Sequence, residues 1–148
     1  MDSEISLRSA RPDDFEAVAA LLGACRLPVA GLAEALGGAL VAAQDGEIVG
    51  SVAIELYGNA ALLRSLAVAS RIRGRGLGER LAAEALRMAR DRGAVDVFLL
   101  TETASGFFPR FGFVPRDRKT APAELQRSVE FRSACPEGAV MMHTRVTP

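Results

Sequence analysis

The chain has 148 residues, 49% of them hydrophobic, with 18 acidic and 18 basic side chains. This length is typical of one compact core, and we expect residues 1–148 to form a single domain. The balanced charge argues against the bulk positive field with which proteins gather nucleic acid or anionic membranes, so neither is an expected partner. Seventeen of the 18 basic residues are Arg and only Lys119 is a lysine, which nearly excludes Schiff-base chemistry.

The chain has two cysteines, one histidine and no CxxC pair. Metal clusters and histidine-based triads need more such residues, so no metal is expected. Cys25 and Cys135 are expected to be buried, unpaired thiols, with a shared site for a soft ligand as the alternative. The N-terminus is acidic without an apolar segment, and no run approaches 18 apolar residues, which predicts a cytoplasmic protein.

The first quarter of the chain predicts a strand and two helices. Apolar and polar residues alternate over 4–8, which predicts a short strand. Apolar residues then recur at helical spacing as far as Cys25. Asp13 is expected to cap this helix, with Glu16 closing a capping box. A weaker helix is expected over 31–36, where two glycines follow it.

The rest of the chain predicts an antiparallel meander, the longest helix and a return to the sheet. Three strands joined by Asp45-Gly46 and Gly58-Asn59 turns are expected over 39–44, 47–57 and 60–69. A single apolar stripe predicts an amphipathic helix over 76–92. A strand, a short helix and two further strands are expected over 95–101, 104–111, 113–116 and 140–146. This order predicts a mixed α/β fold with a central sheet.

A glycine-rich loop, Arg73-Gly74-Arg75-Gly76-Leu77-Gly78, leads directly into the long helix. Unpaired N–H groups and the positive end of the helix dipole bind phosphate at such a loop, and Arg71, Arg73 and Arg75 would add charge-assisted contacts. A Walker loop is excluded because no lysine is near. A dinucleotide fingerprint is excluded because the glycine spacing differs and a β-meander precedes the loop. A turn that merely begins a helix is the structural alternative.

The strand Leu66-Ala67-Val68 followed by Arg73-x-x-Gly76-x-Gly78 resembles the acetyl-coenzyme A motif of the GNAT N-acetyltransferases, and the order of elements is similar over nearly the whole chain. The resemblance implies an acyl-CoA N-acyltransferase fold, a central, mostly antiparallel sheet flanked by helices. A cleft would open where the strand ending at Thr101 splays from the one ending at Val68. Residues 66–68 would bind the pantetheine arm of acetyl-CoA, the cosubstrate, and 73–78 its pyrophosphate. The implied cofactor-binding residues are Leu66, Ala67, Val68, Arg73, Gly74, Arg75, Gly76, Leu77, Gly78, Thr101, Phe107 and Phe108.

The sequence departs from this family at Phe108, where many members carry a tyrosine that protonates the leaving thiolate. The only tyrosine, Tyr57, lies at a turn. Catalysis without that hydroxyl is feasible because water can protonate the thiolate. A degenerate acetyl-CoA sensor without catalysis is the alternative.

The Gly58-Asn59 turn places Glu55 and Arg64 on one face of a hairpin as diagonal neighbours, with Leu66 and Val68 expected on that face too. A salt bridge between Glu55 and Arg64 is the simpler interpretation. The functional interpretation makes Arg64 the anchor for an acceptor's carboxylate and Glu55 the base that removes its ammonium proton, directly or through water. Both can hold.

Three further residues near the predicted cleft are candidates for the acceptor site. Ser65 and Thr101 are candidates for binding the acceptor beside Arg64. Glu102 is the second candidate for the catalytic base, with an exposed loop charge as its alternative.

A narrower resemblance concerns the acceptor. Segments 62–68, 98–101 and 107–113 resemble short amino-acid N-acetyltransferases that include N-acetylglutamate synthases. Segments 27–32 and 122–128, together with Glu130-Phe131 and Cys135-Pro136, resemble the small acetyltransferases of arsenic-resistance operons. Relatives of the latter acetylate arsinothricin, an arsenical mimic of glutamate.

These resemblances imply acetyl transfer to the primary amine of a small amino-acid-like acceptor, such as an arsinic or phosphinic glutamate mimic. Glutamate acetylation for arginine synthesis is the alternative, and a protein N-terminus or lysine is a disfavoured third acceptor. A homodimer through the last strand is compatible with the sequence.

Overall fold

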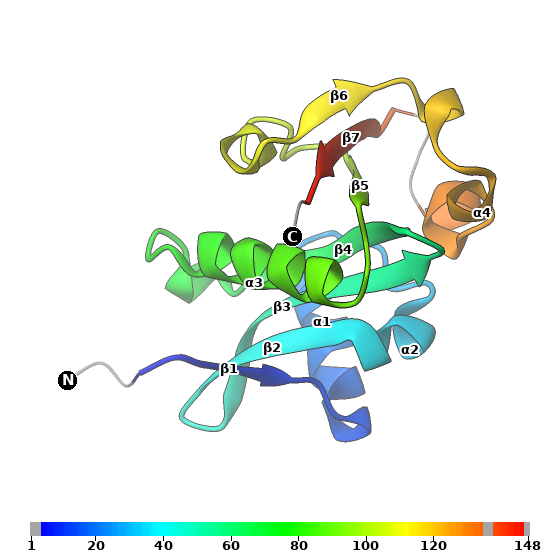
Figure 1. Ribbon diagram of the computed structural model, residues 1–148. Coiled ribbons are helices and arrows are strands. Elements are labelled where there is room, and N and C mark those ends of the chain that lie inside the picture. Colours follow the sequence, from blue (N-terminus) through cyan, green and yellow to red (C-terminus); the bar gives the residue numbers. More distant parts are fainter. Residues whose placement is uncertain (1–3, 135–137, 147–148) are drawn as a thin grey trace.

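The computed structural model describes residues 4–134 and 138–146, and in these residues a seven-stranded open sheet is the centre of the fold (Figure 1). The strands lie in the order β1-β2-β3-β4-β5-β7-β6, and every neighbouring pair is antiparallel except β4 and β5. Their bounds are β1 (Ser6–Ser9), β2 (Ala39–Gln44), β3 (Glu47–Tyr57), β4 (Ala60–Val68), β5 (Asp96–Thr101), β6 (Val114–Arg116) and β7 (Val140–Arg145).

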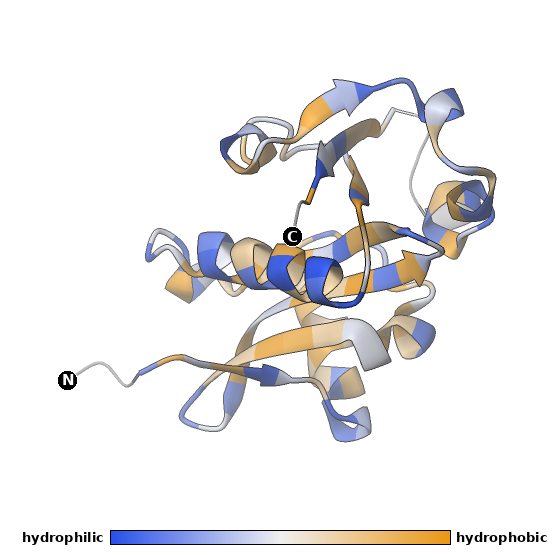
Figure 2. Ribbon diagram, viewed as in Figure 1, coloured by the Kyte–Doolittle hydropathy of each residue, from blue (hydrophilic) through white to orange (hydrophobic). Residues whose placement is uncertain are grey.

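Helices cover both faces of this sheet. The described helices are α1 (Phe15–Ala24), α2 (Leu32–Ala35), α3 (Leu77–Asp91) and α4 (Ala123–Gln126). The apolar stripe of α3 packs on the centre of β3 and β4, while α1 and α2 pack on the other face of the sheet. Figure 2 shows the resulting pattern, with hydrophilic residues on the outer turns of α3 and hydrophobic residues along the central strands. The predicted mixed α/β fold is confirmed.

Short single-turn helices connect these elements. Their bounds are Pro12–Asp14, Leu36–Gly38, Ser70–Ile72, Phe108–Phe111 and Arg118–Thr120 for the 3₁₀ turns, and Glu130–Ala134 for a π-helical turn. The helix predicted over 104–111 is therefore wrong in its first half. Pro109 has no N–H to donate, so only one tight turn forms there before Gly112 ends it. The sequence pattern predicts no element over 117–134, where the structure has a 3₁₀ turn, α4 and the π-helical turn.

The cap of the first helix is also different from the prediction. Asp14, not Asp13, accepts the backbone N–H of Arg11 at 2.7 Å, and its carboxylate also binds Arg8 through two bonds of 2.7 and 3.0 Å. The chain therefore enters α1 through a 3₁₀ turn, one residue later than a capping box at Asp13 requires. The hydrogen bond from Arg8 is the main cause that lowers the pKa of Asp14 to about 2.

We expect Asp14→Asn to lower the free energy of unfolding by about 1–2 kcal/mol at pH 7. Because the pKa of Asp14 is lower in the folded chain than in the unfolded chain, this stabilisation is present above pH 4 and is lost as the pH falls through about 2. Urea titrations at pH 7 and pH 2.5 measure it. Asp13→Asn, at the exposed neighbouring carboxylate, is the control and should change stability by less than about 0.5 kcal/mol. Equal losses in both variants would contradict the assignment.

Candidate active site

A cleft opens where β4 and β5 separate. The two strands pair in parallel only between Ala60–Leu62 and Asp96–Phe98. Beyond these residues β4 continues along β3, and β5 continues along β7. The second half of β4 is therefore not paired with β5, and Figure 1 shows β5, β7 and β6 standing apart from β4, above α3. The predicted splay between the strands ending at Val68 and Thr101 is confirmed.

Two adjoining cavities occupy this opening. The larger, of about 550 Å³, is lined by the second half of β4, the end of β5 and the loop that follows α1. The smaller, of about 350 Å³, lies between β4 and the start of α3. The cavities share four lining residues, Leu66, Val68, Arg73 and Phe107. One continuous cleft can thus hold an elongated molecule along the edge of β4.

The glycine loop forms the outer end of this cleft. Gly74 and Gly76 have φ values of +87° and +79°, a left-handed conformation that glycine adopts without strain. Gly76 is the N-cap of α3 and supplies no side-chain cap, so the first N–H groups of the helix remain available to an anion. Gly74, Gly76, Leu77 and Gly78 all line the smaller cavity. The loop therefore has the backbone geometry of a phosphate site.

The arginines of this region do not all face the loop. Arg73 lines both cavities, and its Nε donates to the carbonyl of Val68 at 3.2 Å. Its Nη2 lies 3.4 Å from the Sγ of Cys25, a half-buried free thiol. Arg71 instead pairs with Glu47 at 2.7 Å and lines neither cavity, so its predicted phosphate contact is not supported. Cys135 lies outside the described residues.

Arg64 lies at the inner wall of the larger cavity and is only 3% exposed. Its guanidinium donates to Glu55 Oε2 at 3.1 Å, to Ser65 Oγ at 3.1 Å and to the Ala30 carbonyl at 2.8 Å. The predicted Glu55–Arg64 salt bridge is therefore present. Tyr57 donates its hydroxyl to the second oxygen of Glu55, and burial and that carboxylate both raise the pKa of the Tyr57 hydroxyl. Both oxygens of Glu55 are thus bound, and Glu55 does not line the cavity.

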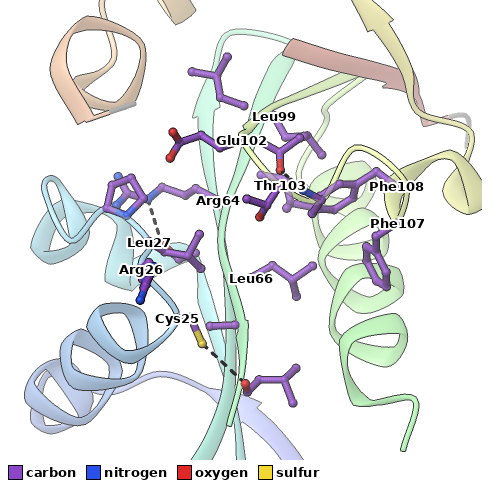
Figure 3. Close-up of a pocket in the computed structure, with 18 of the residues that line it drawn as sticks. Cys25, Arg26, Leu27, Arg64, Leu66, Leu99, Glu102, Thr103, Phe107 and Phe108 are labelled. Atoms are coloured by element: carbon purple, nitrogen blue, oxygen red, sulfur yellow. Dashed lines mark hydrogen bonds between the residues drawn. The ribbon is translucent and has the colours of Figure 1, made fainter. Parts of the chain in front are cut away.

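Ser65 changes the face of β4 on which the following residues lie. Its φ of +61° marks a bulge, and the register with β3 shifts between Ser51 and Ala53. As a result Arg64 points toward the loop after α1, whereas Leu66 points toward α3, as Figure 3 shows. The expectation that Leu66 and Val68 share the face of Arg64 is therefore wrong, since both pack against the core beneath α3.

A second carboxylate, Glu130, approaches Arg64 from the C-terminal segment. Its Oε1 lies 3.9 Å from Arg64 Nε, its side chain is 5% exposed, and it lines the larger cavity. Oε2 has no hydrogen-bond partner in the described part of the chain. Burial, together with the negative charge of Glu55, raises the pKa of Glu130 to about 7 despite the opposing effect of Arg64. Sequence reasoning gave Glu130 no role, because nothing along the chain shows that this segment returns to β4.

The remaining predicted site residues lie on the β5 side of the cleft. Thr101 and Glu102 both line the larger cavity, with Glu102 exposed and the Thr101 hydroxyl accepting the N–H of Ala104 at 2.9 Å. Phe107 borders both cavities. Phe108 is 5% exposed and packs edge-on against Phe113, with the ring centroids 5.6 Å apart. The cleft thus has apolar aromatic walls, a buried carboxylate, Glu130, beside Arg64 and an exposed one, Glu102, on the β5 side.

Two general features of the described residues bear on function. No helix among residues 4–134 and 138–146 is long and apolar enough to cross a membrane. In the same ranges, no group of three or more His, Cys, Asp or Glu side chains is arranged to hold a metal ion.

Comparison with known proteins finds relatives of this chain. An uncharacterized N-acetyltransferase of Chlorobaculum tepidum is 34% identical in an alignment of length 105 that covers 68% of this chain and 67% of the relative. A Mycobacterium tuberculosis protein solved with CoA and NLQ is 26% identical, with a TM-score of 0.81 over 96% of this chain and 99% of that one.

The N-acetylglutamate synthase of Neisseria gonorrhoeae, solved with coenzyme A and N-acetyl-glutamate, has the same fold, with a TM-score of 0.84 at 20% identity. That match covers all of this chain, which spans only 36% of the synthase. The Acetyltransferase (GNAT) domain profile matches residues 35–115, which include β2 to β5, the glycine loop and α3. The chain therefore belongs to the GNAT family of acetyltransferases.

Proposed function

We propose that the chain transfers the acetyl group of acetyl-CoA to the primary amine of a small, acidic, amino-acid-like acceptor. The observation that carries this proposal is the buried Arg64 at the inner wall of the larger cavity. A guanidinium has five N–H donors, and its bonds to Ser65, Glu55 and Ala30 use three of them. The remaining donors suit a carboxylate, phosphinate or arsinate group of an acceptor.

Acetyl-CoA, which supplies the activated acetyl group, would lie along the edge of β4 and in the smaller cavity. Leu66, Ala67 and Val68 are not paired with β5, so this edge offers amide partners for the pantetheine arm beside the Val68 carbonyl that Arg73 binds. Residues 73–78, with two left-handed glycines at the start of α3, offer N–H groups to the pyrophosphate. An N–H from the 66–68 edge would polarise the acetyl carbonyl. Phe107 and Phe108 would exclude water from the cleft beside these groups.

Apolar side chains and a buried cation meet on the acceptor side of the larger cavity. Leu27, Pro28 and Leu99 line it together with the buried Arg64. An acid group that must reach a buried guanidinium favours a free amino acid over a lysine of a folded protein. The ligand of the Neisseria synthase structure, N-acetyl-glutamate, supports an amino-acid acceptor. An arsinic or phosphinic mimic of glutamate is our preferred acceptor, because segments 27–32 and 122–128 resemble the small acetyltransferases of arsenic-resistance operons. Glutamate, which also has a second acidic group, is the alternative.

The test is the release of coenzyme A thiol from acetyl-CoA by the purified protein. The acceptors are arsinic and phosphinic glutamate analogues, glutamate, other amino acids and a lysine peptide. We expect turnover confined to acceptors with an acidic side chain, and selectivity for the arsinic or phosphinic analogue would establish a detoxifying enzyme. Selectivity for glutamate would favour a biosynthetic role. Binding of acetyl-CoA without turnover of any amine would contradict the proposal and favour a sensor.

A further inference from the structure

We propose that Glu130 accepts the proton from the acceptor's ammonium group, while Glu55 serves as the structural counterion of Arg64. This inference rests on the function proposed above, because it needs an amine bound beside Arg64. It assigns the proton transfer to a residue outside the strands and loop that hold acetyl-CoA.

The geometry separates the three carboxylates near the cleft. Both oxygens of Glu55 are bound, one by Arg64 and one by Tyr57, and Glu55 is not a lining residue. Glu102 also lines the cavity, but its side chain is exposed to water. Glu130 lines the cavity, is buried, and has one oxygen without a partner in the described residues. A buried acceptor atom without a partner is costly, and an ammonium donor would satisfy it.

The groups around Glu130 and its burial set the pKa of its carboxyl group. Arg64 and Glu55 face it from the sheet, Tyr57 lies beyond Glu55, and Arg118 reaches the neighbouring Phe131 from the turn before α4. The net effect, dominated by burial, is a pKa of about 7. A base whose pKa lies near the working pH combines a useful ionised fraction with affinity for the proton. Glu55 is instead occupied by its bonds to Arg64 and Tyr57.

The proposed step balances as follows. One proton passes from the acceptor's ammonium nitrogen to Oε2 of Glu130, which frees the nitrogen lone pair. That pair forms the new C–N bond to the acetyl carbon as the C–S bond breaks, and its electrons go to sulfur. The second proton leaves the nitrogen for the thiolate, directly or through water. Glu130 then returns its proton to solvent, and the products are the N-acetyl compound and the coenzyme A thiol.

The test is the pH dependence of kcat/KM in Glu130→Gln, measured with whichever primary amine the unmodified protein acetylates fastest. In the unmodified protein we expect kcat/KM to rise with pH through a midpoint near 7, because only ionised Glu130 accepts a proton. In Glu130→Gln we expect this rise of kcat/KM with pH to disappear. We also expect kcat/KM to fall about 100-fold at pH 7.5, with acetyl-CoA affinity unchanged. Glu34→Gln, an exposed carboxylate on α2, is the matched control and should keep both rate and profile.

Other outcomes overturn the inference. If the rise of kcat/KM near pH 7 is retained in Glu130→Gln, or is lost in Glu102→Gln, Glu130 is not the acceptor of this proton. If Glu130→Gln does not fold, Glu130→Asp takes its place. It should keep the rise of kcat/KM with pH but at a lower kcat/KM throughout. If only the lysine peptide is acetylated, the proposed function fails, but the same comparison still decides the role of Glu130. Failure to acetylate any amine would overturn both.

Discussion

Gly76→Glu is expected to weaken acetyl-CoA binding by at least about 100-fold, since like-charge contact in a binding site costs several kcal/mol. Gly76 is the N-cap of α3, and an added Cβ would meet no atom within 4 Å, so the strain of a side chain there comes from its left-handed backbone alone. The new carboxylate would lie against the N–H groups at the start of the helix, which it would satisfy in place of the pyrophosphate. Isothermal titration with coenzyme A measures the loss directly.

Gly93→Glu is the matched control for this prediction. Gly93 follows the other end of α3, has a φ of +96° and has equally open space. Both variants place a non-glycine residue in the left-handed region, which costs roughly 1–2 kcal/mol of stability. Only Gly76→Glu should lose coenzyme A affinity. Unchanged affinity in Gly76→Glu would contradict the placement of the pyrophosphate at residues 73–78.

Arg64→Ala is expected to lower the free energy of unfolding by about 3–5 kcal/mol, because it leaves the carboxylates of Glu55 and Glu130 near each other without their shared cation. On the proposed function it should also raise the KM for the acceptor far more than the KM for acetyl-CoA. Chemical denaturation and steady-state kinetics check the two effects separately. Equal changes in both KM values would mean that Arg64 is structural.

Three further variants separate the effect of the buried charge of Arg64 from other effects of its loss. Arg71→Ala breaks an exposed pair with Glu47 and should cost less than about 1 kcal/mol. Adding Glu130→Gln to Arg64→Ala should recover about 0.5–3 kcal/mol, since it removes one of the two stranded charges. Arg64→Met fills the buried volume without the charge and serves for the kinetics if the alanine variant does not fold. Strict additivity of Arg64→Ala and Glu130→Gln would show that the 3.9 Å contact carries no coupling.

The sequence alone predicted the parts of the molecule that depend on short-range chemistry. The Asp45-Gly46 and Gly58-Asn59 turns set the register of the meander, and with it the pairing of Glu55 with Arg64. The apolar stripe of α3 predicted which of its faces is buried. The glycines before α3 predicted the shape of the loop. Each of these depends on residues within a few positions of one another, where backbone preferences act directly.

Other parts could not be predicted because they depend on contacts between distant segments. A left-handed Ser65 is not encoded by its residue type, and Ser51 fixes that backbone from the neighbouring strand by donating to the Ser65 carbonyl at 2.7 Å. Glu130 reaches Arg64 only because the chain returns across 65 residues of sequence through α4. Arg71 lies between β4 and the glycine loop, yet the 3₁₀ turn at 70–72 directs its side chain to Glu47 and not to the loop. No short stretch of sequence predicts this backbone conformation or these two contacts.

The bulge at Ser65 has a consequence for how this protein can change over evolution. Within three residues β4 passes from the face that carries Arg64 to the face that carries Leu66. On the proposed function, the acceptor and the coenzyme therefore meet different sides of one strand. Substitutions around Arg64 can alter which amine is chosen while those beneath α3 keep the coenzyme affinity, since residues without shared contacts vary almost independently. The strand thus allows new acceptors to be adopted without rebuilding the site for the acetyl donor.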